Sequence, residues 1–168
     1  MTRPLIFLIV IIGVVFLAKQ LSEKKEEEKR GLSVYKRKNF LFDTVTEFNL
    51  YKILLELFGD RYHIFAQVNY SHLVEVKPMP FTEQRKYRSS IDRKSADFVL
   101  CDKERVVPQL IIELDGGVHS FKSKKARDKF IDDLTKIVDL PILHIQIKNL
   151  EREFIKNEIN NKLGLNNI

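Results

Sequence analysis

The hydrophobic residues of this chain form one long unbroken run near its start and several short, periodic runs further along. Residues 5–18 read LIFLIVIIGVVFLA and contain no charged side chain. From residue 44 onward, apolar residues recur every three or four positions, as in helices, or alternate with polar ones, as in strands. The pattern predicts an apolar segment at 4–21, a charged segment at 22–38 and a globular domain at 39–168.

The globular part is expected to be a mixed α/β domain. Residues 44–58 predict an amphipathic helix that begins with the capping-box pattern TVTE. The later runs predict strands over 62–69, 96–101 and 109–114, a helix over 123–138, a strand over 141–146 and a last helix over 150–163. The polar stretch 71–94 is expected to be a long excursion with a short helical turn at 71–76. The predicted order is α-β-β-β-α-β-α.

The apolar run is expected to anchor the chain in a membrane. Its fourteen residues make roughly 21 Å of helix, which is shorter than a hydrocarbon core of ~30 Å, so the flanking residues extend it to 4–21. Lys19 would then reach back to the interface. A cleaved signal peptide is the alternative, although only Arg3 precedes the run and no A-x-A site follows it. A buried core helix is disfavoured because the segment is apolar all round.

Charge decides the expected orientation. The chain has 29 Lys and Arg against 23 Asp and Glu, a formal charge of +6, yet residues 39–168 contain 20 basic and 19 acidic residues. Most of the excess lies just after the apolar run, so the positive-inside rule predicts a single-pass inner-membrane protein with a cytoplasmic domain. The single cysteine, Cys101, excludes an intramolecular disulfide framework. The charged segment is expected to be a solvated spacer, with a helix as the alternative.

Two acidic residues lie in segments that are otherwise apolar. Asp97 is in the strand at 96–101, and Glu113 ends the run Leu110–Ile112. A short turn at 102–105 joins these strands, so we expect antiparallel neighbours with both carboxylates at the same depth. A buried carboxylate costs several kcal/mol unless it is paired or binds a metal. The pair therefore predicts a site for Mg²⁺ or Mn²⁺, and Asp115 shares the strand face of Glu113.

Basic residues flank these acids in the sequence. Arg93 and Lys94 close one cluster directly before the strand of Asp97, and Lys122, Lys124 and Arg127 lie in a second cluster after the strand of Glu113. Both clusters are candidates for contacts with nucleic-acid phosphates. The alternative is an ordinary solvated surface.

The order of elements, with an acid on the second strand and E-x-D on the third, resembles the PD-(D/E)XK (restriction-endonuclease-like) nucleases. The stretches ADFVL at 96–100, IELDGGVH at 112–119 and LPILHI at 140–145 are similar to one branch of that superfamily. That branch holds the very-short-patch-repair endonucleases and related bacterial domains of unknown function. The resemblance covers roughly residues 35–165 and implies an αβββαβ core.

The resemblance also implies a metal-dependent nuclease. Asp97 and Glu113 would bind the divalent metal, assisted by the carbonyl of Leu114, and the metal would polarise the phosphate and activate a water molecule. The superfamily usually has a lysine two residues after the glutamate, where this chain has Asp115. The expected substrate is nucleic acid, with DNA favoured. The alternative is a catalytically inactive relative that binds nucleic acid or a protein at the membrane.

Further candidate site residues also have structural explanations. His119 is a candidate base or phosphate contact, or else an ordinary loop histidine. Glu47 could complete the site from the first helix, or could serve only the capping box. Asp115 could simply belong to a turn. The other histidines, His63, His72 and His144, are expected at structural or surface positions.

Overall fold

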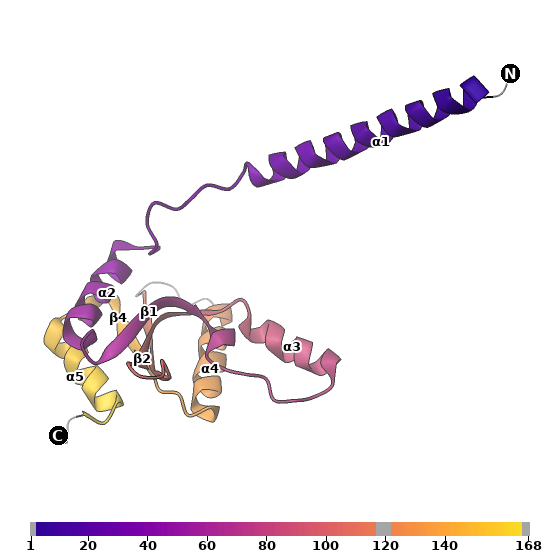
Figure 1. Ribbon diagram of the computed structural model, residues 1–168. Helices are drawn as coiled ribbons and strands as arrows, with labels where there is room; N and C mark the ends of the chain where they lie inside the picture. The colour runs from indigo at the N-terminus through magenta and orange to yellow at the C-terminus, as the bar shows by residue number, and fades with distance from the viewer. Residues whose placement is uncertain (1–2, 117–121, 166–168) are drawn as a thin grey trace. The chain divides into compact units, whose positions relative to one another are not determined.

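The computed structural model describes residues 3–116 and 122–165, and it describes the backbone alone for 3–12 and 122–127. The chain forms two compact units, Met1–Leu41 and Phe42–Ile168. The elements, labelled in Figure 1, follow in the order α1 (Arg3–Leu32), α2 (Val45–Phe58), β1 (Tyr62–Asn69), η1 (Tyr70–His72), α3 (Phe81–Ile91), β2 (Ser95–Asp102), β3 (Pro108–Asp115), α4 (Lys122–Ile137), β4 (Ile142–Gln146), η2 (Ile147–Asn149) and α5 (Arg152–Lys162).

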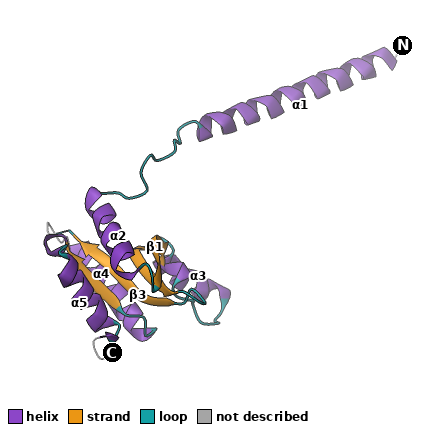
Figure 2. Cartoon of the chain, turned by 60° about the vertical axis from the view of Figure 1, so that its left-hand side comes forward, coloured by secondary structure: helices purple, strands orange, loops and turns teal. Residues whose placement is uncertain are grey.

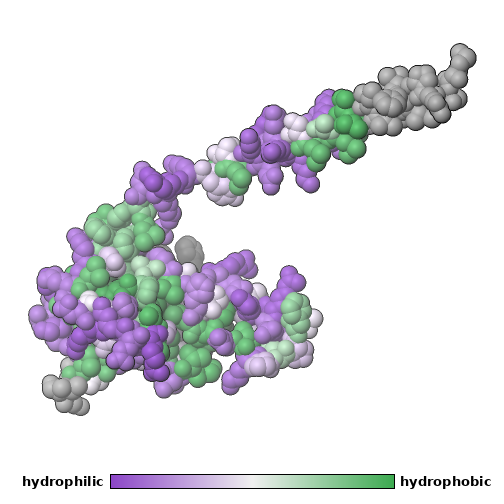
Figure 3. All heavy atoms as spheres, viewed as in Figure 1, coloured by the Kyte–Doolittle hydropathy of each residue, from purple (hydrophilic) through white to green (hydrophobic). Residues whose placement is uncertain are grey.

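The first unit contains α1, in which the predicted apolar segment and the start of the charged segment form one helix. All side chains described between Gly13 and Leu41 are exposed. In Figure 3 the described apolar part of α1 is a green band that adjoins a purple, charged stretch. Within the described residues, no helix combines the length and the apolarity needed to cross a membrane. The charged segment, predicted as a spacer with a helix as the alternative, is an exposed helix as far as Leu32.

The second unit begins with α2, and the capping box sets its start. The hydroxyl of Thr44 accepts the backbone N–H of Glu47 at 3.1 Å, and the Glu47 carboxylate accepts the N–H of Asp43 at 3.0 Å. The first contact satisfies an N–H group that has no partner inside the first turn of the helix, and the second ties the residue before the cap to that turn. Leu50 and Leu54, four residues apart, are completely buried on the inner face of α2. The predicted helix and its starting residue are confirmed.

The sheet has the strand order β1-β2-β3-β4. β1 pairs with β2 and β2 with β3, both antiparallel, whereas β3 pairs with β4 in parallel after the α4 crossover. Helices lie on both faces of the sheet in Figure 2. The mixed α/β fold and the antiparallel β2–β3 hairpin agree with the prediction from the sequence.

Two hydrophobic clusters form because alternate residues of each strand point to opposite faces of the sheet. In one cluster Phe98 and Leu100 of β2 pack with α2 and α5. In the other, Val99 of β2 and Ile111 of β3 pack with Tyr70 and with Ile131 of α4. Odd-numbered residues of β2 and β3 therefore face α4. This parity fixes where the candidate site lies.

The predicted polar excursion at 71–94 contains a helix that the sequence analysis missed. The predicted turn at 71–76 is the shorter η1, and α3 follows Pro80. Within α3 only Ile91 is buried, while Phe81 is 75% exposed. Because one buried residue does not make a hydrophobic stripe, the periodicity that reveals α2 is lacking here.

The β2–β3 turn is held by one carboxylate at the end of β2. Asp102 accepts three backbone N–H groups, from Glu104 at 2.9 Å, Arg105 at 2.7 Å and Val107 at 2.8 Å. The bond from Arg105, followed by those from Val107 and Glu104, holds the pKa of Asp102 below its usual range. An aspartate that satisfies backbone donors in this way is a turn-forming residue.

Candidate active site

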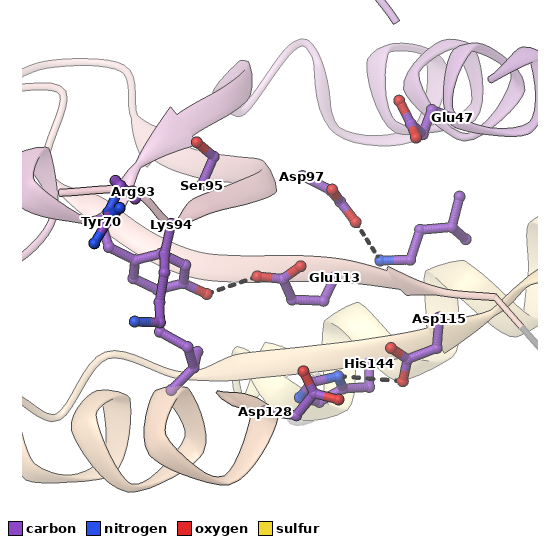
Figure 4. Close-up of a pocket in the computed structure, with 12 residues that line it drawn as sticks. Glu47, Tyr70, Arg93, Lys94, Ser95, Asp97, Glu113, Asp115, Asp128 and His144 are labelled. Carbon is purple, nitrogen blue, oxygen red and sulfur yellow. Dashed lines mark hydrogen bonds and ion pairs between the residues drawn. The ribbon is translucent and has the colours of Figure 1, made fainter. Parts of the chain in front are cut away.

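One cleft of about 260 Å³ gathers most of the acids that the sequence analysis selected (Figure 4). It lies at the end of the β2–β3 hairpin opposite the Asp102 turn, and strands β2, β3 and β4 contribute to its walls with η1, α2 and α4. Its lining residues are Glu47, Tyr70, Arg93, Lys94, Ser95, Asp97, Glu113, Leu114, Asp115, Asp128, Ile131 and His144.

Asp97 and Glu113 are brought together by the register of the hairpin. Phe98 pairs with Ile112, so the next positions along the ladder place Asp97 opposite Glu113. Both have the strand parity that faces α4, and so does Asp115. This convergence was expected from the sequence, and the structure places all three acids in one cleft.

Asp97 is held by one backbone donor in an acidic environment. Its Oδ2 accepts the N–H of Leu114 at 2.8 Å. Burial raises the pKa of Asp97, the Leu114 N–H opposes that rise, and the charge of Glu47 adds to it. The carboxylate is therefore costly to keep ionised without a cation beside it.

Gln67 lies across from Asp97 on β1 and has an unusual backbone. The neighbouring pairs Ala66 with Phe98 and Val68 with Ala96 place it opposite Asp97. Its φ of +55° lies in the left-handed region, which a non-glycine residue rarely adopts. Its side chain makes a hydrogen bond with Asp97 that favours the ionised carboxylate. Backbone strain of this kind often accompanies functional sites.

Glu113 is positioned by Tyr70, which the sequence analysis did not select. The Tyr70 hydroxyl donates to Glu113 Oε1 at 2.7 Å, and the tyrosine is only 1% exposed. Burial and the adjacent charge of Glu113 raise the pKa of Tyr70, so its phenol stays protonated and remains a donor. Tyr70 follows directly after β1, and no sequence motif marks it.

His144 is a second residue that the sequence analysis missed. His144 is exposed, as predicted, but it also lines the cleft between two carboxylates. Its Nδ1 is 3.3 Å from Asp115 Oδ2, and its Nε2 is 3.0 Å from Asp132 Oδ1 on α4. Figure 4 shows the contact with Asp115 as a dashed line. The partners come from β3 and α4, so adjacency in the sequence could not reveal them.

Arg93 and Lys94 are the predicted phosphate-contacting residues that line the cleft. Lys94 Nζ donates to the carbonyl of Ser90 and lies 4.9 Å from the ring centre of Phe130. Lys122, Lys124 and Arg127 belong to α4 by their backbone, but their side chains lie outside the described residues, as does all of His119.

Glu47 both caps α2 and lines the cleft. It caps α2 through Asp43, and it lines the cleft near enough to Asp97 to raise the pKa of that carboxyl. In Figure 4 it lies on its helix across the cleft from Asp97.

A comparison with protein families assigns the domain to a family. A family model described as "Protein of unknown function (DUF2726)" matches residues 39–163. The chain belongs to this family. No curated protein and no solved structure matches the sequence.

The side chains that line the cleft of this DUF2726 domain can be compared with the ligands that a divalent cation requires. Among the described residues, no three His, Cys, Asp or Glu side chains are placed to hold a metal ion together. Asp97 and Glu113 nevertheless provide a pair of hard oxygen donors. Mg²⁺ typically takes one or two carboxylates from a protein and completes its octahedron with water and phosphate oxygens. Five acidic side chains line the cleft against two from Lys and Arg, and this charge imbalance favours a cation.

Proposed function

We propose that the protein is a metal-dependent nuclease that hydrolyses phosphodiester bonds of nucleic acid. One observation carries the proposal: Asp97 and Glu113 lie opposite each other on paired strands, in a cleft that also contains Arg93 and Lys94. Carboxylates for a cation and basic groups for phosphate oxygens are the two requirements of this reaction. The resemblance to the PD-(D/E)XK nucleases supports the same conclusion.

Each group would have a defined task. Asp97 and Glu113 would bind Mg²⁺ or Mn²⁺, which when bound polarises the phosphate and lowers the pKa of a water molecule. The Leu114 N–H and the Tyr70 hydroxyl keep the two carboxylates in place. Arg93 and Lys94 would contact backbone phosphates beside the cleft. The oxygen of water attacks phosphorus and gives up a proton to solvent, the P–O ester bond breaks, and the leaving oxygen takes up a proton from solvent.

The test is cleavage by the full-length protein purified in a mild detergent. Single- and double-stranded DNA and RNA are incubated with Mg²⁺ or Mn²⁺, and with EDTA as a control. We expect metal-dependent cleavage, with DNA as the preferred substrate. Asp97→Ala or Glu113→Ala should reduce cleavage at least ~10³-fold, because each removes several kcal/mol of transition-state stabilisation. The matched control is Asp102→Ala, at the far end of the same hairpin. Cleavage that survives both cleft substitutions would contradict the proposal.

A second candidate is a non-catalytic relative that binds nucleic acid or a protein. The observation in its favour is Asp115, which stands where the superfamily usually has lysine. Calorimetry with Mn²⁺ and binding assays with labelled oligonucleotides separate the candidates. Binding of nucleic acid without cleavage, at any metal concentration, favours this second function.

We also propose that the apolar segment at 4–21 tethers the domain to the inner membrane, with the domain in the cytoplasm. The support is the uncharged run at 5–18, the exposure of Val14–Leu17, and the basic residues that follow. Fractionation of cells, and a reporter fused after Ile168, test the tether and its orientation. A chain found only in the soluble fraction would refute the tether, and a reporter active only outside the inner membrane would refute the orientation.

A further inference from the structure

His144 links two acidic residues that lie on different elements of the domain. Asp115 ends β3, His144 lies on β4, and Asp132 lies on α4, the helix that connects those strands. The distances of 3.3 Å and 3.0 Å put each ring nitrogen of His144 beside a different carboxylate. The β3–α4–β4 crossover therefore closes a chain of three side chains, Asp132–His144–Asp115.

The two contacts of His144 differ in where they lie relative to the cleft. Asp132 does not line the cleft, whereas Asp115 and His144 do. A carboxylate on the outer nitrogen fixes the ring orientation, as in other sites where an acid orients a histidine. With the ring held in this orientation, Nδ1 stays beside Asp115. An ionised carboxylate accepts hydrogen bonds only, so the ring N–H at Nε2 is the donor to Asp132, and Nδ1 forms an ion pair with Asp115 when the ring is protonated.

Asp115 is well placed for a role different from that of the metal-binding pair. It lies two residues after Glu113 on the same strand face, and its Oδ2 is the atom next to His144. Its other oxygen, as a carboxylate oxygen, can accept a hydrogen bond from a water molecule that enters the cleft. Such an acceptor aligns a water for attack on a phosphate that is held at Asp97 and Glu113.

We infer that His144, anchored by Asp132, is a positioning residue that holds Asp115 in the orientation needed to align the attacking water. This inference rests on the proposed nuclease function and assigns its water-positioning group. His144 touches neither the phosphate nor the metal in this role, and it acts through Asp115.

The test compares substitutions along the chain in the full-length protein. His144→Ala should lower kcat about 10–100-fold, the scale expected when a positioning contact is lost. The affinity for Mn²⁺, measured by calorimetry, and KM should stay within about twofold, because uniform binding is not affected. His144→Arg should recover most of kcat, because a guanidinium can donate to both carboxylates. His63→Ala is the matched control, a strand histidine outside the cleft.

A double-mutant cycle separates positioning from general destabilisation. If His144 acts through Asp115, the double variant Asp115→Ala with His144→Ala should be no slower than Asp115→Ala alone. Cleavage that depends on Asp97 and Glu113 but does not respond to His144→Ala would overturn the inference and leave the nuclease function standing. Additive losses, or no recovery with His144→Arg, would also overturn it. If the wild-type protein binds Mn²⁺ but cleaves nothing, the proposed function fails, and the inference fails with it.

Discussion

The two ends of the β2–β3 hairpin each contain an aspartate of β2, and the two residues have opposite surroundings. Asp102 is at the turn and accepts three backbone N–H groups, which lower its pKa. Asp97 is at the cleft, accepts one backbone N–H from Leu114, and is half-buried beside other acids, which raises its pKa. The same residue type, on the same strand, is stabilised at one end and destabilised at the other.

The difference shows how a structural acid can be distinguished from a candidate functional one. Where local backbone donors satisfy a carboxylate, its charge contributes to the fold. Where burial and like charges oppose ionisation, the fold gains nothing from the charge, and a bound cation is the remaining source of compensation. The same contrast suggests variants that act on only one end of the hairpin.

A large loss of metal affinity is expected from Tyr70→Phe, which removes the donor to Glu113 but keeps the ring that packs in the core. We expect the Kd for Mn²⁺ to rise about 10–100-fold, as when other second-layer contacts of metal sites are lost. Titration calorimetry measures the change. Tyr51→Phe, in the opposite hydrophobic cluster, is the matched control. An unchanged Kd would show that Tyr70 does not position Glu113 for a metal.

Asp97→Asn should stabilise the metal-free protein while abolishing its activity. Because the pKa of Asp97 is raised in the folded state, the ionised carboxylate lowers stability once the pH exceeds the usual value of 3.8. Stability is therefore highest below that value and is lost as the pH rises through the raised pKa. In EDTA at about pH 7, the melting temperature of the variant should be a few degrees higher, since about 1 kcal/mol shifts it by roughly 2–4 °C. At about pH 4 the gain should shrink.

Asp102→Asn should show the opposite sign and the opposite pH dependence. The pKa of Asp102 is lowered in the folded state, so its charge adds stability above the usual value and this contribution is lost as the pH falls through the lowered one. The melting temperature of the variant should be lower at neutral pH and should approach that of the wild type in acid. Thermal unfolding followed by circular dichroism checks this. If both aspartate variants changed stability in the same direction, the contrast between the two ends would be wrong.

Glu47→Gln should give the smallest effect and separate the two roles of this residue. Glutamine can still accept the Asp43 N–H, so the start of α2 and the melting temperature should change little. Loss of the charge should lower the pKa of Asp97 and weaken Mn²⁺ binding modestly. Glu47→Ala should lower the melting temperature as well. Calorimetry and thermal unfolding together measure both roles.

The sequence predicted the parts of the molecule in which local pattern and tertiary structure agree. The three- and four-residue spacing of apolar residues over 44–58 and the cap at Thr44 revealed α2, and a short turn between two apolar runs revealed the β2–β3 hairpin. The placement of Asp97 opposite Glu113 followed from that hairpin. α3 was missed because only Ile91 is buried along it.

The residues missed in the site depend on long-range pairing. His144 meets Asp115 only because β4 joins β3 in parallel, and it meets Asp132 only because α4 packs across both strands. Tyr70 reaches Glu113 over 43 residues of sequence. A polar residue that alternates with apolar ones on the edge strand β4, as His144 does in ILHIQ, was the one available signal.

The left-handed backbone of Gln67 has a consequence for engineering. A residue with φ near +55° costs of order 1–3 kcal/mol, and glycine would relax that cost. Screens for heat-resistant variants would therefore favour glycine at position 67. The same substitution would remove the amide that bonds to Asp97. Selection for thermal stability at this position would therefore remove a side chain of the cleft, so a gain in melting temperature there should come with a loss of activity.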